Sequence, residues 1–222
     1  MKIDQIRKTA AFSGRWPREL CYSPVCWYYH EGCLYMDIGA PGSGAQTESL
    51  DSLLPQVRHI FVNRGLSLLK QKPFSRFPNL ESVTLSEQVT RLDWHDFEDC
   101  KALKKVTLPE GIRAIPSYTF YRCAALEEVN IPDSVTVFGE FAFCGCSSLK
   151  SLHIPPGLEE INRYALSGCA AFEQGLLSFD HCPKLKSVPK PGVQLPEDDG
   201  TESDDDYWFF GDAWRDMMED ET

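Results

Sequence analysis

The central part of this sequence repeats itself every 23 residues. Four cysteines share one register of the repeat, and six apolar positions recur with them over four consecutive units. The recurring cysteines are Cys100, Cys123, Cys146 and Cys169. A fixed period of roughly 20 to 50 residues is typical of stacked arrays, in which each unit buries its apolar face against its neighbours. The repeat therefore predicts a solenoid with one coil per unit.

Each unit reads approximately L-x-x-V-x-(L/I)-P-x-x-(V/I)-x-x-(L/I)-x-x-x-x-F-x-x-C. The alternation V-x-(L/I) predicts a short strand with two inward side chains, and the proline that follows ends it because proline has no amide to donate. A second extended piece follows, such as Val135 to Phe138, and the Phe-x-x-Cys segment returns the chain through a turn or a helical turn. A fifth unit with Phe77 in place of cysteine precedes these four, and a shortened unit with Cys182 follows them.

The stacked cysteines are expected to form a structural column. Equivalent positions of neighbouring coils lie about 4.8 Å apart, and side chains in register point the same way, so the Cβ atoms stay farther apart than the roughly 3.8 Å of a disulfide. A zinc ion needs ligands that converge from different directions, which a straight column does not provide. We therefore expect small buried hydrophobes at these positions and no cofactor. Cys144 is expected to point outward as an exposed thiol.

The stretch LEEVNIPDSVTVFGEFAFCGCSSLKSLHIP, residues 126–155, closely resembles the BspA-like class of leucine-rich repeats. The consensus of that class runs L-x-x-V-x-I-P-x-x-V-x-x-I-G-x-x-A-F-x-x-C, and the match covers about Val57 to Val188. WYYHEGCLYMDIGAPGSG, from Trp27 to Gly44, looks like the N-terminal segment of such proteins, in which a glycine turn joins two strands. The resemblance implies an α/β-type, mostly β repeat. Its form would be a right-handed leucine-rich-repeat solenoid of about five to six coils with an N-terminal β cap.

The chain divides into three predicted regions: an N-terminal capping region (1–56), the solenoid (57–190), and an acidic linker with an aromatic C-terminal segment (191–222). From Glu197 onward there are twelve acids and one base, whereas the preceding residues hold 33 − 12 = 21 acids and 22 − 1 = 21 bases. A neutral body lacks the basic surface of a nucleic-acid-binding protein, and the acidic block would repel phosphates. We therefore expect no nucleic-acid partner.

Localisation is inferred from the cysteines and the apolar runs. No stretch approaches 18 consecutive apolar residues, so membrane insertion is not expected. The nine cysteines are an odd number in a chain much longer than most disulfide-built domains, which favours a reducing, cytoplasmic setting. The alternative is a secreted or cell-surface protein whose leader was removed.

The candidates for chemistry in the sequence are weak. The five histidines do not recur with acidic partners at ligand spacing, so we expect no catalytic role; they are His30, His59, His95, His153 and His181. His95 begins a column with Tyr118, Phe141 and Tyr164 that predicts aromatic packing between coils. Cys21, Cys26 and Cys33 do not have the C-x2-C spacing of a zinc site. The glycine-rich GAPGSG from Gly39 is not followed by Lys-Ser or Lys-Thr and predicts a loop.

The outward side of the strands is the predicted partner-binding face. Lys104, Glu127 and Lys150 form one charged column, and Lys105 stacks over Glu128 in another. Such exposed pairs contribute less than about 1 kcal/mol each and indicate a solvated face. Between the charged columns runs a central row in which a protein partner would make contact. This row consists of Phe61, Thr84, Thr107, Asn130 and His153.

The C-terminal segment has two possible roles. EDDGTESDDD has seven acids in ten residues and predicts a linker without stable structure. Seven large apolar residues follow, some at helical i, i+4, i+7 and i+8 spacing; they are Tyr207, Trp208, Phe209, Phe210, Trp214, Met217 and Met218. The segment either covers the open end of the last coil or docks as a short helix into a groove of a partner.

The sequence thus predicts a non-enzymatic module for protein–protein interaction. The alternative is an exported cell-surface adhesin or host-contact protein, since the BspA-like family implies recognition on bacterial surfaces. The family supplies no catalytic residues. An enzyme or metal protein that uses the N-terminal cysteines is a third class, and it would require stoichiometric zinc in the purified protein.

Overall fold

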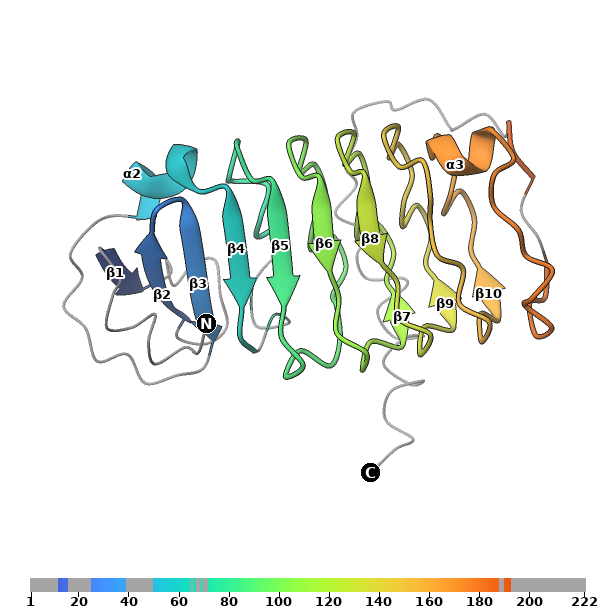
Figure 1. The fold of residues 1–222 in the computed structure, drawn as a ribbon, viewed down its shortest axis with the longest axis horizontal. Coiled ribbons are helices and arrows are strands. Elements are labelled where there is room, and N and C mark those ends of the chain that lie inside the picture. The colour runs from blue at the N-terminus through green and yellow to red at the C-terminus, as the bar shows by residue number, and fades with distance from the viewer. Residues whose placement is uncertain are drawn as a thin grey trace, which may run out of the picture.

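The computed structural model describes residues 12–15, 25–38, 50–64, 66, 69, 72–187 and 190–192. These residues form a stack of coils in which the chain advances steadily from the N-terminal end to the C-terminal end (Figure 1). The elements are β1 (Phe12–Arg15), β2 (Val25–His30), β3 (Cys33–Ile38), α2 (Leu50–Leu53), the 3-10 helix η2 (Leu54–Gln56), β4 (His59–Val62), β5 (Ser82–Leu85), β6 (Lys105–Thr107), β7 (Ala114–Ile115), β8 (Glu128–Asn130), β9 (Val137–Phe138), β10 (Glu160–Ile161) and α3 (Ala170–Glu173). The aromatic C-terminal segment, Cys21 and the stretch GAPGSG lie outside the described residues.

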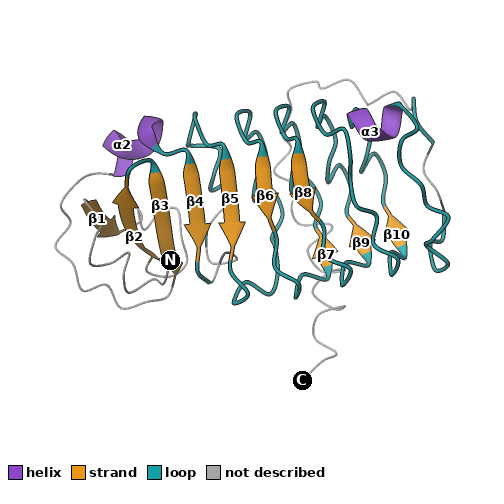
Figure 2. Cartoon of the chain, viewed as in Figure 1, coloured by secondary structure: helices purple, strands orange, loops and turns teal. Residues whose placement is uncertain are grey.

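The main sheet has seven strands in the order β1-β2-β3-β4-β5-β6-β8. Strands β3, β4, β5, β6 and β8 are parallel, and the register pairs Ile60 with Val83, Val83 with Val106 and Val106 with Val129. The 23-residue spacing of the sequence is therefore the register of the sheet. The structure confirms the predicted right-handed solenoid, which is mostly β with few and short helices (Figure 2).

The N-terminal cap extends the main sheet with antiparallel strands. Strands β2 and β3 pair as a hairpin, β1 pairs with the other edge of β2, and β3 pairs in parallel with β4. The hairpin turn, Glu31–Gly32, has two positive φ angles of 46° and 80°, which match the twist of the paired strands. Trp27, from β2, is fully buried beneath the first coil. The boundaries of the three predicted regions stay predictions.

A second, smaller sheet of parallel strands has the order β10-β9-β7. The second extended pieces of three units form it, but β9 begins at Val137, two residues later than predicted. The difference arises because the amide of Val135 donates to the carbonyl of Pro132 at 3.1 Å and closes a turn. Val135 is nevertheless fully buried, so its side chain packs in the core although the residue lies outside the strand.

The return segments are also hydrogen-bonded from coil to coil. The amides of Phe97, Phe120 and Phe143 donate to carbonyls of the next coil at 2.9, 2.8 and 2.7 Å. Two residues per coil have left-handed backbone, for example Tyr118 and Arg122 with φ of 59° and 58°. Non-glycine residues rarely adopt this conformation. In this protein the left-handed residues lie in the return turns, where some amides donate to carbonyls of the next coil instead of carbonyls of their own turn.

A ladder of phenylalanine rings runs through the core. The rings of Phe74, Phe97, Phe120 and Phe143 stack with centroids 5.1, 5.1 and 5.2 Å apart, and all four side chains are fully buried. Offset-stacked aromatic pairs contribute about 0.5–1.5 kcal/mol beyond the burial of their area. Because each ring contacts the equivalent ring of the next coil, the ladder ties the coils into one core.

The approach of two coils at Gly139 leads to a testable prediction. A Cβ at Gly139 would lie 2.4 Å from the amide nitrogen of Ser117, whereas a Cβ at Gly111 would meet nothing within 4 Å. We expect Gly139→Ala to lower the free energy of unfolding by about 1–3 kcal/mol, since the backbone must shift to remove the overlap. The matched variant Gly111→Ala should stay within about 0.5 kcal/mol of the wild type. Urea denaturation of both variants measures this, and equal effects would contradict the close approach.

Candidate functional site

The central row of the strand face crosses the parallel strands in register. Phe61 pairs with Thr84, Thr84 with Thr107, and Thr107 with Asn130. Phe61 and the two threonines are partly exposed, and Asn130 and His153 are exposed. The structure thus brings the first four predicted residues into one row, while His153 lies in the next coil, beyond the last strand of the sheet.

The row continues onto the N-terminal cap, which sequence reasoning missed. Tyr35 is in register with Phe61, and Tyr28 is in register with Tyr35. The rings of Tyr35 and Phe61 have centroids 6.1 Å apart, and all three aromatic residues are partly exposed. The alternation of buried and exposed residues in WYYHEGCLYMDI was the signal that could have found this extension. We call the row Tyr28, Tyr35, Phe61, Thr84, Thr107, Asn130 and His153 the strand-face row.

Two residues of the strand-face row are engaged by polar contacts within the chain. The side-chain amide of Asn130 accepts from the Leu108 amide at 2.8 Å and donates to the Leu108 carbonyl at 3.0 Å. The imidazole Nε2 of His153 lies 2.7 Å from Oδ1 of Asp133. By contrast, no hydrogen bond joins the hydroxyl of Thr84 or Thr107 to the described part of the chain. These two hydroxyls at the centre of the row are therefore available to a partner.

Ion pairs between coils flank the strand-face row. Glu81 contacts Arg58 at 2.5 Å and Lys104 at 3.2 Å, and Lys105 contacts Glu128 at 2.7 Å. The predicted pairing of Lys105 with Glu128 is confirmed. Hydrogen bonds from Arg58 and then Lys104 hold the pKa of the Glu81 carboxyl below its ordinary value. Each of these acidic side chains is therefore paired with a basic side chain of a neighbouring coil.

The cysteine column is buried, and its four thiols are free of disulfides. Cys100, Cys123, Cys146 and Cys169 are each at most 3% exposed and free. The Sγ of Cys123 donates to the Phe97 carbonyl at 2.9 Å, and the Sγ of Cys146 donates to the Phe120 carbonyl at 3.2 Å. Burial raises the pKa of both thiols. A buried, protonated thiol is a poor nucleophile, so the column has a packing role.

The prediction that Cys144 is an exposed thiol was wrong. Its exposed fraction is 1%, and burial raises the pKa of its thiol to about 11. The equivalent residues of two other coils, Glu98 and Ser167, are also buried. Left-handed residues at Phe141 and Gly145 flank this position, so the polar residues at the equivalent positions of other coils do not indicate an outward side chain in the return segment.

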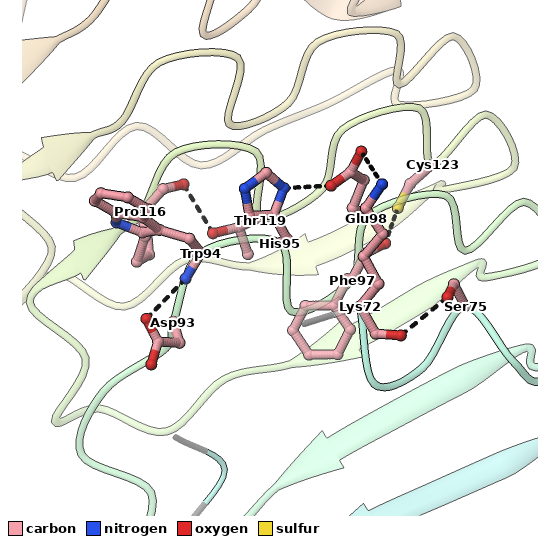
Figure 3. Close-up of polar contacts among 10 residues, drawn as sticks. All are labelled: Lys72, Ser75, Asp93, Trp94, His95, Phe97, Glu98, Pro116, Thr119 and Cys123. Carbon is pink, nitrogen blue, oxygen red and sulfur yellow. Dashed lines mark hydrogen bonds and ion pairs between the residues drawn. The ribbon is translucent and has the colours of Figure 1, made fainter. Parts of the chain in front are cut away.

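Two buried carboxyl groups, those of Glu98 and Asp96, lie at the return segment of an early coil, and sequence reasoning missed them; Figure 3 shows Glu98 with its partners. Glu98 is 5% exposed; its Oε1 lies 3.1 Å from the ammonium of Lys72, and its Oε2 contacts Nδ1 of His95. The neighbouring Asp96 accepts from the amide of Asp93 at 2.7 Å, and burial raises its pKa well above the ordinary value. Both carboxyl groups are satisfied within the protein, so they stabilise the turn.

The outer aromatic column packs as predicted. The ring centroids of His95, Tyr118, Phe141 and Tyr164 lie 4.9, 5.0 and 5.0 Å apart in stacked geometry. Because each ring covers the face of the next, the column does not present a flat aromatic platform for a ligand. The guanidinium of Arg163 lies over the ring of the last member, Tyr164, at 4.7 Å from its centroid.

Two of the three N-terminal cysteines, Cys26 and Cys33, lie within the described residues. Cys26 is buried and Cys33 is partly buried; burial and the charge of Glu31 raise the pKa of Cys33. Among the residues that the structure describes, no three His, Cys, Asp or Glu side chains gather so that they could hold a metal ion. Within the same part of the chain, no helix has the length and apolar composition to cross a membrane. The predicted C-terminal motif, Tyr207 to Met218, lies outside the described residues.

The coil, its register and its cysteine position define a repeat protein of the leucine-rich type. The model of the BspA type Leucine rich repeat region matches residues 67–178 in six copies, about half of the chain, and the chain belongs to this family. A comparison with curated proteins gave no match.

Three solved structures of bacterial leucine-rich repeat proteins are similar to this chain. The protein of Eubacterium ventriosum is 18% identical with a TM-score of 0.47, and the match covers 52% of this chain and 32% of that one. The T. pallidum protein is 21% identical with a TM-score of 0.49 over 83% and 84% of the two chains. The Bacteroides ovatus protein is 17% identical with a TM-score of 0.43 over 74% and 45%. The chain thus spans about a third of the first protein and less than half of the third.

The buried thiol of Cys144 makes the free energy of unfolding depend on pH in the alkaline range. Its pKa rises from 9.0 to about 11 on folding, so the stabilisation is complete below pH 9 and is lost as the pH rises toward 11. We expect the free energy of unfolding to fall by on the order of 2 kcal/mol over this interval through this thiol. Urea denaturation at pH 7, 9 and 10.5 should show a smaller fall for Cys144→Ala than for the wild type. Identical falls would contradict the assignment.

Proposed function

We propose that this chain is a non-enzymatic protein-interaction module that binds a protein partner on its strand-face row. The observation that carries the proposal is the continuity of the row. Three aromatic residues and two threonines with free hydroxyls lie side by side on paired strands, and neighbouring charges are already neutralised by one another. Membership of a family of recognition repeats supports the same reading.

The geometry of the row favours a protein over other ligands. Aromatic residues are enriched at the energetic centres of protein interfaces, and Tyr28, Tyr35 and Phe61 form such a centre beside the polar half of the row. The row lies on hydrogen-bonded strands, so little conformational entropy is lost when a partner binds.

The test uses two Thr→Arg substitutions at different sites. Thr107→Arg places a long charged side chain at the centre of the row, whereas Thr136→Arg makes the same change just before β9, outside the main sheet. We expect the first variant to weaken partner binding at least about tenfold, the loss typical of disrupting an interface centre. The second variant should bind like the wild type.

Affinity capture from producing cells with the two variants and the wild type identifies the partner, and calorimetry with the purified partner measures the dissociation constants. Circular dichroism establishes that both variants are folded. A partner that binds all three proteins equally would contradict the role of the row.

We further propose that the protein functions in a reducing compartment. The column cysteines Cys100, Cys123, Cys146 and Cys169 are all free, which supports this proposal over an exported adhesin. A thiol count on protein taken directly from producing cells, denatured without reductant, should approach nine. A count near one would instead support export and disulfide formation.

A further inference from the structure

The C-terminal end of the solenoid carries an apolar surface. Leu176, which follows α3, is 61% exposed and is the one exposed large hydrophobic side chain among the described residues. Leu177, Phe179 and Leu185 are only partly buried against the core. We call these four residues the end face; they belong to the last coil, which lies beyond β10 at the end of the stack (Figure 1).

The two ends of the solenoid differ in the described part of the chain. At the N-terminal end, the β2–β3 hairpin continues the main sheet, and Trp27, Leu50 and Leu53 are buried against the first coil. At the C-terminal end, no strand in the described ranges pairs with the outer edge of β10. A terminal coil has a neighbour on one side only, so its core-facing side chains stay in contact with water unless another segment covers them.

The chain beyond the last coil starts beside the end face. The amide of Gly192 donates to Oε2 of Glu173 in α3 at 3.0 Å, and the amide of Leu176 donates to the carbonyl of Ala171 in the same helix at 2.9 Å. The exit of the chain and the exposed leucine are thus held by one short helix. Residues 193–206 separate this exit from Tyr207, and a chain of that length has a root-mean-square span of about 20 Å.

The composition of the C-terminal segment matches the end face. Phe210, Trp214, Met217 and Met218 have the spacing of one apolar helix face. The ammonium groups of Lys184 and Lys186 in the last coil are already paired with Glu159 and Glu160, so the apolar side chains carry the match. The chain from Glu197 onward has twelve acids and one base.

The same charges argue against a second copy of the chain as the occupant. Joining two end faces would bring two C-terminal segments together, each with a net charge of −11. A tethered segment also has an effective concentration in the millimolar range, far above that of a second molecule in solution. We propose that the segment Tyr207–Met218 of the same chain packs on the end face and closes the solenoid.

A double-mutant cycle in the full chain tests this contact. The four proteins are the wild type, Leu176→Asp, Trp214→Ser and the double variant. In the otherwise wild-type chain the aspartate would be placed beneath the C-terminal segment, so we expect Leu176→Asp to lower Tm by about 4 °C or more. With Trp214→Ser the segment no longer covers the end face, and the same substitution should then shift Tm by less than about 1 °C, because Leu176 is exposed.

The matched control is Thr107→Asp on the strand face, which should change Tm equally in the wild-type background and in the Trp214→Ser background. Equal effects of Leu176→Asp in both backgrounds would overturn the proposal. The proposal would also be overturned if the coupling between Leu176→Asp and Trp214→Ser disappeared on dilution and sedimentation showed a dimer. That result would assign the end face to a second copy of the chain.

Amide exchange provides a second measurement that does not depend on the stability of the variants. In the folded wild-type chain, amides of residues 207–218 should exchange more slowly than in Leu176→Asp. Exchange at the rate of an unstructured peptide in both proteins would show that the segment does not pack on the end face.

Discussion

Each coil of this protein is joined to its neighbours by backbone hydrogen bonds that recur at equivalent positions. The amide of Glu81 donates to the carbonyl of Arg58 at 2.7 Å, Lys104 donates to Glu81 at 2.8 Å, and Glu127 donates to Lys104 at 2.9 Å. This register stacks equivalent positions of the repeat, so each core phenylalanine packs on the phenylalanine of the next coil and the cysteines form one column. The same register aligns the outward-facing residues of the strands and so forms the strand-face row.

Much of this architecture could be predicted because residues at equivalent positions of successive repeats are also neighbours in space. Val83, Val106 and Val129 recur at a fixed spacing in the sequence, and the same residues pair across the sheet. The alternation along each strand also identifies which residues face outward. The candidate row of Phe61, Thr84, Thr107 and Asn130 could therefore be assembled from sequence alone.

Sequence reasoning failed where the backbone leaves the regular alternation. Cys144 was expected on the surface, yet the left-handed residues around it place the thiol in the interior. Glu98 is a second case, since it is a buried carboxylate satisfied by Lys72 from the preceding coil. Lys72 lies 26 residues from Glu98, which is not the 23-residue spacing of the repeat, so no repeat motif predicts this contact. The hydrogen-bonded return segment also has no signature beyond the fixed period of the repeat itself.

The two proposed contacts follow from the same stacking. The sides of a stacked array are continuous and provide a rigid surface for a partner. Its two ends expose core-facing side chains that another segment must cover. The N-terminal hairpin closes one end, and the C-terminal segment is the part of this chain suited to close the other. Binding by the strand face and closure of the end face use different residues, so either can be disrupted without the other.

Residue-resolved amide hydrogen exchange of the native full chain tests the stacking register most directly. The account predicts that the slowest exchange recurs every 23 residues, at the amides of Glu81, Lys104 and Glu127 and at those of Phe97, Phe120 and Phe143, with the fastest of these in the outer coils. Slow exchange without this period, or confined to one contiguous segment, would contradict a fold held together by equivalent contacts between successive coils.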